Sequence, residues 1–269
     1  MSALPIDFQL ALASLPDMAR GLLTNIVLTF ITLAIGLFTS LLVTLARMSK
    51  SRVVSGLAGL YVVFFRGAPL LILLYLVYYG FGQITALREG PLWLIFGSAF
   101  ACAIIGLVLN HTAFMVEVVR GALEAVPAGL IEASKALGIT PRQTFLRIRL
   151  PLAMRYGLKA YQNEVVMFAK GTAVVSTITV NDLTAVANGI FETTYDPFTP
   201  ILTAAALYWI FVNVVRLGFL KIDRYLNEHL TSDEKQRQKV VVRSSAGRLS
   251  GPALTPVGAA MPAARERAA

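Results

Sequence analysis

The chain has 269 residues, of which 56% are hydrophobic and only 14% are charged. Soluble domains carry about 25% charged residues, so this composition excludes an ordinary cytosolic enzyme and a disordered chain and indicates an integral membrane protein. The single cysteine, Cys102, excludes a disulfide scaffold and a cysteine-based metal framework. Basic residues beside apolar spans set membrane orientation, so the net charge of +9 predicts membrane lipid, and no nucleic acid, as a partner.

Five apolar stretches are long enough to cross a membrane, which takes about 20 helical residues. The predicted spans are 22–46, 67–87, 91–116, about 160–180 and 197–215. The apolar stretch 53–65 is cut off by Arg66 and is expected to lie at the membrane interface. The fold class is therefore all-α integral membrane with five transmembrane helices.

The predicted spans divide the chain into an external N-terminal segment at 1–20, a transmembrane domain at 21–230 and a tail at 231–269. The end of the tail is rich in Ala, Pro, Ser and Arg, and such a composition buries too little apolar surface to fold. We therefore expect the tail to be disordered.

The basic residues predict the orientation of the spans. They gather after the first, third and fifth spans, and the loop between the fourth and fifth spans is acidic. Five spans put the two ends of the chain on opposite sides. The positive-inside rule then places the N-terminus outside and the C-terminus in the cytoplasm.

The loop between the third and fourth spans has clear helix signals. Pro127 fits a first helical turn, and Gly138 fits the left-handed position that ends a helix. Thr140 and Gln143 form a capping-box pattern for a second short helix, which Pro151 is expected to stop. The pattern predicts a helix–turn–helix at the membrane surface, which is either a docking element or a simple amphipathic connector.

The spacing within this loop matches a known signature. Glu132-Ala133, Gly138, Ile148 and Leu150-Pro151 resemble the Glu-Ala-Ala loop of permease subunits of bacterial ABC importers, with Ser134 in place of the second Ala. Other stretches resemble the polar amino-acid branch of these permeases, which includes the histidine/lysine/arginine/ornithine and glutamine permeases. These stretches are Phe65 to Leu71, Ala113 to Gly121, and Asn163-Glu164 with Lys170-Gly171-Thr172.

The resemblance covers about residues 20–230 and implies a type I ABC importer permease fold in a bacterial inner membrane. It implies a transport subunit, not an enzyme, for polar and cationic amino acids or related compounds such as opines. The rival hypothesis is a potential-driven secondary carrier or channel for a small polar solute. No phosphate-binding loop occurs in the sequence, so ATP and Mg are expected on a partner ATPase, and this chain is expected to bind no cofactor.

The resemblance also implies the partners. A cytoplasmic ABC ATPase dimer would dock on the coupling helix in the loop between the third and fourth spans, and an external solute-binding protein would deliver the substrate. A homologous permease or a second copy of this chain would complete the passage. The coupling residues implied are Glu132, Ala133, Ser134, Gly138, Ile148, Leu150 and Pro151.

Polar residues within the spans are candidates for the substrate passage. Glu164 lies thirteen residues after Pro151, about 20 Å along a helix and thus near mid-membrane. An intramembrane carboxylate normally faces a cavity or a partner, so Glu164, with Asn163 beside it, either contacts a cationic substrate or makes a structural pair with Lys170 or Arg66. A pair with Lys170 is unfavourable because six residues put the two side chains about 120° apart.

Asn110 and Glu117 share a face of the third span because they are seven residues apart. Asn110 either lines the passage or connects helices through a hydrogen bond, and the latter is favoured. Glu117 either lines the passage or pairs with Arg120, three residues on. His111 has no second ligand at a suitable spacing, so we expect no metal site, and no catalytic residues are identified.

Overall fold

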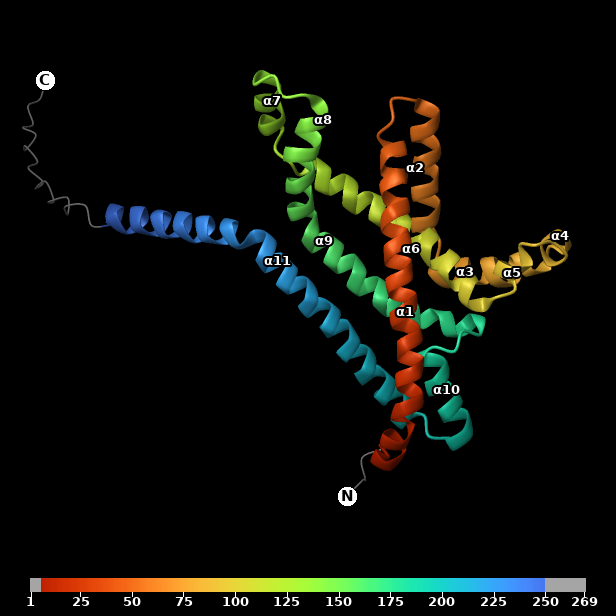
Figure 1. Ribbon diagram of the computed structural model, residues 1–269. Helices are drawn as coiled ribbons and strands as arrows, with labels where there is room; N and C mark the ends of the chain where they lie inside the picture. The colour runs from red at the N-terminus through yellow and green to blue at the C-terminus, as the bar shows by residue number, and fades with distance from the viewer. Residues whose placement is uncertain (1–5, 250–269) are drawn as a thin grey trace, which may run out of the picture. The chain divides into compact units, whose positions relative to one another are not determined.

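The computed structural model describes the backbone of residues 6–249 and the side chains of residues 6–225, and every element in that part is helical (Figure 1). The chain forms two compact units, Met1–Arg224 and Tyr225–Ala269. Three of the described helices are long and apolar enough to cross a membrane, and two bent helix pairs raise the number to as many as five. The all-helical membrane fold predicted from the sequence is therefore confirmed.

Helix α1, Phe8–Arg47, is the central helix of the first unit. It begins fourteen residues before the predicted first span, directly after Asp7, whose carboxylate accepts hydrogen bonds from the N–H groups of Gln9 and Leu10. The buried residues of α1 are mostly small or polar, although Met18 and Leu28 are also buried, and small residues let membrane helices pack closely. The small and polar ones include Gly21, Asn25, Thr29, Thr32, Gly36, Ser40 and Thr44.

The region of the second predicted span differs from the prediction. Helix α2, Arg52–Gly67, packs against α1 and α6 and is not a separate interfacial segment. The chain then bends by 106° into the segment Leu70–Gln83, which comprises α3, Leu70–Tyr75, the π-helical turn η1, Leu76–Gly80, and the 3-10 turn η2, Phe81–Gln83. Pro69 causes this bend because it lacks an N–H group and forces Ala68 out of the helical conformation. The prediction of a straight span at 67–87 is therefore wrong.

Two short helices, α4, Thr85–Arg88, and α5, Trp93–Phe96, precede the next long helix. Helix α6, Ala99–Glu124, begins and ends eight residues later than the predicted third span. Its start is fixed by Ser98, whose hydroxyl accepts a hydrogen bond from the N–H of Ala101.

The predicted fourth span is the middle of a longer, bent element. The helices α7, Ala128–Ala136, and α8, Pro141–Thr144, are followed by the π-helical turn η3, Phe145–Arg149, and by α9, Leu150–Gly171. The 3-10 turn η4, Thr172–Ile178, ends at Thr179, which has a φ of 64°. The helical segment Pro141–Ile178 makes an angle of 51° with α10, Leu183–Thr194.

Pro151 does not stop a helix, contrary to the sequence-based expectation. It lies in the first turn of α9, directly after η3, in which the N–H of Leu150 donates to the carbonyl of Phe145. The π-helical turn η3 just before Pro151 accommodates this residue, which has no N–H group to donate.

The last described helix, α11, covers Phe198–Leu249, and its apolar part, Phe198–Tyr225, corresponds to the fifth predicted span. Of the expected tail, residues 231–249 are helical, and residues 250–269 lie outside the described residues.

The long helices connect two distinct ends of the first unit. The turn between α1 and α2 and the short helices α7 and α8 lie at one end, and the start of α1 and α10 lie at the other (Figure 1). The basic residues Arg47, Lys50 and Arg52 lie at the same end as α7 and α8.

Candidate functional site

The turn between α7 and α8 has the geometry that the sequence predicts. Gly138 has a φ of +70°, and the chain closes over the end of α7 through hydrogen bonds from the N–H groups of Gly138 to Lys135 and of Ile139 to Ser134. Thr140 and Gln143 form the predicted capping box at the start of α8. Residues 128–144, which we call the α7–α8 turn, are thus fixed by local chemistry.

The α7–α8 turn presents an exposed surface supported by a buried hydrogen bond. Glu132, Ala133 and Leu137 are exposed, and Leu137 keeps 78% of its surface accessible. Ser134 is buried instead, and its hydroxyl lies 3.0 Å from that of Thr144. Ser134 therefore joins the two short helices.

The remaining coupling residues predicted from the sequence follow the α7–α8 turn. Ile148 and Leu150 are half-buried, in η3 and at the start of α9, and Pro151 is exposed. They connect the exposed surface of the turn to the long helix that continues into the unit.

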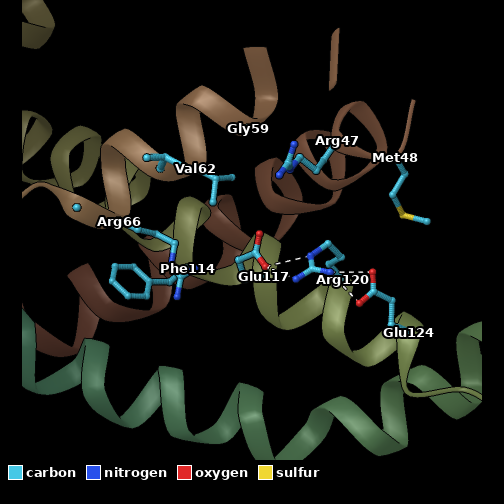
Figure 2. A pocket seen from close by; sticks show the side chains of 11 residues that line it. Arg47, Met48, Gly59, Val62, Arg66, Phe114, Glu117, Arg120 and Glu124 are labelled. Atoms are coloured by element: carbon cyan, nitrogen blue, oxygen red, sulfur yellow. Dashed lines mark hydrogen bonds and ion pairs between the residues drawn. The ribbon is translucent and has the colours of Figure 1, made fainter. Parts of the chain in front are cut away.

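A first cavity, of about 730 Å³, lies between the ends of α1, α2 and α6 (Figure 2). Its size is typical of small-molecule sites, which measure about 300–1,000 Å³. It is lined by Arg47, Met48, Gly59, Val62, Val63, Arg66, Gly67, Phe114, Glu117, Arg120 and Glu124.

Arg120 is held between two carboxylates in the first cavity. Its guanidinium lies 2.7 Å from Glu117 and 2.7 Å from Glu124, as Figure 2 shows. The predicted pairing of Glu117 with Arg120 is confirmed. The charge of Arg120 is therefore already matched within α6.

A second cavity, of about 400 Å³, lies between α2, α6 and α9 and shares Arg66, Phe114 and Glu117 with the first. It brings together Glu117 and Glu164, two of the four candidate passage residues. In the sequence, Arg66 is a charge that ends an apolar stretch, a candidate pairing partner of Glu164, and part of the stretch 65–71 that resembles the polar amino-acid permeases. The structure places Arg66 where both cavities meet.

The other two candidate passage residues line neither cavity. Asn110 donates a hydrogen bond of 3.1 Å to the carbonyl of Phe65, so it joins α6 to α2, which was the favoured alternative. Asn163 is exposed on α9. In the part of the chain with described side chains, Glu164 makes no ion pair with Lys170 within 4 Å.

A buried polar cluster at the other end of the unit was not predicted. Asp182, at the start of α10, and Asn25, on α1, are wholly buried. The Asn25 amide donates to Asp182 over 3.0 Å and to Thr172 over 3.3 Å, and the N–H of Leu183 donates back to Asn25 over 3.0 Å. The hydroxyl of Tyr208 on α11 also donates to Asp182, over 3.2 Å.

We call this cluster of Asn25, Thr172, Asp182 and Tyr208 the Asn25–Asp182 node. It joins α1, η4, α10 and α11, and Gly21 allows the close approach, since a Cβ there would lie 2.8 Å from the Cα of Leu183. The sequence contains one indication of this node, because Asn25 is a polar residue inside a long apolar run.

His111 packs inside the helix bundle. It is buried, its ring centroid lies 4.6 Å from that of Phe168, and a Cβ at Gly36 would lie 2.5 Å from its ring. Among the residues with described side chains, no three His, Cys, Asp or Glu residues gather as metal ligands would.

Comparisons with known proteins identify the family. Residues 32–226 match the family described as binding-protein-dependent transport system inner membrane component. The nopaline transport system permease protein NocM of Agrobacterium fabrum is 39% identical over 226 residues, which cover 84% of this chain and 94% of NocM. The arginine ABC transporter permease protein ArtM of Haemophilus influenzae is 34% identical over 205 residues, which cover 76% of this chain and 90% of ArtM.

Solved structures agree. A structure described as the crystal structure of an amino acid ABC transporter with histidines matches with a TM-score of 0.72 and 30% identity, over 82% of this chain and 99% of that chain. An inward-facing structure of the MetNI methionine ABC transporter shares the fold, with a TM-score of 0.60 and 22% identity. The chain therefore belongs to the family of binding-protein-dependent transport system inner membrane components.

Proposed function

We propose that this chain is the permease subunit of an ABC importer that carries cationic amino acids or opines. The relatives NocM and ArtM are named as permeases for nopaline and arginine. The observation that carries the proposal is the second cavity, which Glu164 and Glu117 both line. Carboxylates inside a membrane domain are expensive unless they serve a cavity or a partner, and a cationic substrate is such a partner.

The α7–α8 turn is proposed as the contact with the ATPase, which is a separate subunit. Its exposed apolar residue Leu137 and the small residue Ala133 lie on the surface beside Glu132. Small side chains permit close approach of a partner, and the closed turn at Gly138 makes the surface rigid. Movement of the ATPase would thereby reach α9, which follows the turn directly.

The transport cycle that fits this arrangement is alternating access. ATP binding would draw the α7–α8 turns of two permease subunits together and open the passage outward, and hydrolysis would reset it. The second permease is either another copy of this chain or a homologue, and an external solute-binding protein would deliver the substrate.

The proposed orientation follows the charges. The α1–α2 turn with Arg47, Lys50 and Arg52 lies at the end that carries the α7–α8 turn, and positive loops face the cytoplasm. The N-terminus would then face outward and the C-terminus inward.

Uptake by proteoliposomes tests the function. The liposomes contain this chain, its ATPase and its binding protein, with or without ATP on the ATPase side. Labelled arginine, lysine, histidine, glutamine, octopine and nopaline are offered separately. We expect ATP-dependent uptake of at least one cationic compound; uptake that persists without ATP would favour a potential-driven carrier, and no uptake of any compound would overturn the proposal.

A further inference from the structure

Arg66 is a cation at the boundary of the two cavities. It occupies the last turn of α2, just before the 106° bend. Its guanidinium carbon lies 5.2 Å from the centre of the Phe114 ring, an arrangement in which the ring face attracts a cation. Among the described side chains, that of Arg66 makes no hydrogen bond and no ion pair within 4 Å, so its five N–H donors are available.

Glu164, like Arg66, lies far along its own helix. Arg66 is fourteen residues along α2 from Arg52, and Glu164 is fourteen residues along α9 from Leu150. At 1.5 Å per residue each charge lies about 21 Å along its helix. Helix α2 starts at the end that carries the α7–α8 turn, and α9 starts further in, because α8 and η3 precede it (Figure 1). Both charges therefore lie well away from that end of the unit.

Arg66 and Glu164 both line the second cavity without touching. Their opposite charges attract one another, but no oxygen of Glu164 lies within 4 Å of the guanidinium nitrogens. Glu117, which also lines this cavity, is held by Arg120. The cavity therefore presents one available cation and one available carboxylate on different walls.

A ligand that satisfies both groups must itself carry both charges. We infer that Arg66 binds the carboxylate of the transported amino acid while Glu164 receives its cationic end. A guanidinium fits a carboxylate through two parallel hydrogen bonds, and the Phe114 ring would hold the guanidinium plane in place. This inference rests on the proposed function and names Arg66 as a residue that determines substrate specificity.

The other arginines of the cavities are less suited to this role. Arg120 is engaged by Glu117 and Glu124. Arg47 donates to the carbonyl of Ser55 over 3.3 Å and lines only the first cavity. Arg66 is thus the cation within reach of Glu164.

The test measures binding by the permease–ATPase complex without the binding protein, so that only the permease site is probed. The probes are labelled L-arginine and L-argininamide, which lacks the carboxylate; if uptake identifies another amino acid, that compound and its amide are used. We expect the unmodified complex to bind the acid at least about tenfold more tightly than the amide.

Arg66→Gln should weaken binding of the acid by about 10- to 100-fold, as expected for loss of a hydrogen-bonded charge. Binding of the amide should be unchanged or tighter, because one positive charge has been removed. Arg66→Lys should keep part of the preference. The matched control is Arg88→Gln, since Arg88 also lies over an aromatic ring, 5.9 Å from the centre of Trp93, but lines neither cavity.

Several outcomes would overturn this assignment while the proposed function stands. One is that Arg66→Gln weakens binding of the acid and of the amide equally, and another is that this variant keeps the full preference for the acid over the amide. A third is that the unmodified complex transports the acid but shows no preference for it over the amide, or no measurable binding of it. Absence of uptake for every compound would instead remove the proposed function, and this assignment with it.

Discussion

Two carboxylates within the helical unit differ in what surrounds them. Asp182 is wholly buried and accepts hydrogen bonds from Asn25, Tyr208 and the N–H of Ala185. Glu164 is half-buried, lines a cavity and has no hydrogen bond to its carboxylate among the described residues. A buried carboxylate whose hydrogen bonds are all made within the protein stabilises the fold, whereas a carboxylate without such hydrogen bonds can bind a ligand. We therefore assign Asp182 a structural role, and the contrast supports the role in transport that we propose for Glu164.

Glu164→Gln should reduce ATP-dependent uptake of a cationic amino acid by about tenfold, the size of one charged hydrogen bond. Uptake of glutamine should change by less than about threefold, because a neutral side chain gains little from the carboxylate. The measurement is initial uptake by proteoliposomes. Glu192→Gln is the control, since Glu192 is exposed on α10; equal losses for both classes of substrate would make Glu164 structural.

Gly138 is the residue on which the shape of the α7–α8 turn depends. A Cβ at this position meets no atom within 4 Å, so backbone conformation alone penalises a substitution. At a φ of +70°, Gly138→Val should cost about 1–2 kcal/mol locally, and it should abolish ATP-coupled uptake while the subunit still inserts. Gly138→Asn should keep much of the uptake, because Asn adopts this conformation more readily. Equal uptake by the two variants would show that the conformation of the α7–α8 turn does not determine the coupling of ATP to uptake.

The residues that could be predicted from the sequence are those whose geometry is local. Gly138 and Thr140 were predictable because a left-handed turn and a capping box involve neighbours within four residues. The meeting of Arg66 with Glu164 was not, because α2 and α9 are about a hundred residues apart and only the packed bundle brings them to one cavity. For Asn110 the sequence left two roles open, and the hydrogen bond to the carbonyl of Phe65 corresponds to one of them, because a buried amide in an apolar helix needs a hydrogen-bond partner.

At the scale of elements, the Asn25–Asp182 node explains how helices with largely apolar surfaces adopt one arrangement. Apolar faces alone give little direction, since lipid is as apolar as they are. The node joins α1, η4, α10 and α11 through directional hydrogen bonds. It fixes the end of the unit opposite the α7–α8 turn.

Asn25→Leu should destabilise the unit by about 1–3 kcal/mol, because Asp182 and the N–H of Leu183 then remain buried with fewer partners. The measurement is the thermal unfolding midpoint of the purified subunit in mild detergent. The control is Asn213→Leu, because the Asn213 amide bonds only within α11, to the carbonyl of Trp209. An equal midpoint for the two variants would show that the node contributes no more than an ordinary helix-surface bond.

The boundaries of the elements were harder to predict than their existence. Hydropathy identifies apolar stretches, but Pro69 bends the predicted second span and Pro151 begins a helix instead of ending one. Both are prolines between apolar residues, and the sequence does not distinguish them. For Pro151, the π-helical turn η3 that precedes it determines that a helix begins there instead of ending.

At the scale of the whole first unit, the α7–α8 turn and the cavities form a connected path. The turn leads into η3 and α9, and α9 carries Glu164 to the second cavity. A displacement of the turn would therefore reach the cavity through one nearly continuous helical element. This path requires that a partner bind the α7–α8 turn. Such binding can be tested at the exposed apolar side chain of the turn, Leu137.

Leu137→Asp should remove the ATPase from the complex. Leu137 is 78% exposed, and burying such a side chain against a partner is worth about 2 kcal/mol, so its replacement by a charge should lower ATPase binding at least about tenfold. The measurement is co-purification of the ATPase with the tagged permease, with size-exclusion profiles to show that the permease itself is intact. Leu137→Met is the control, because it keeps an apolar side chain of similar volume. If Leu137→Asp retained the ATPase as well as Leu137→Met does, the α7–α8 turn would not be the docking surface, and the path from ATPase to cavity would have to begin elsewhere.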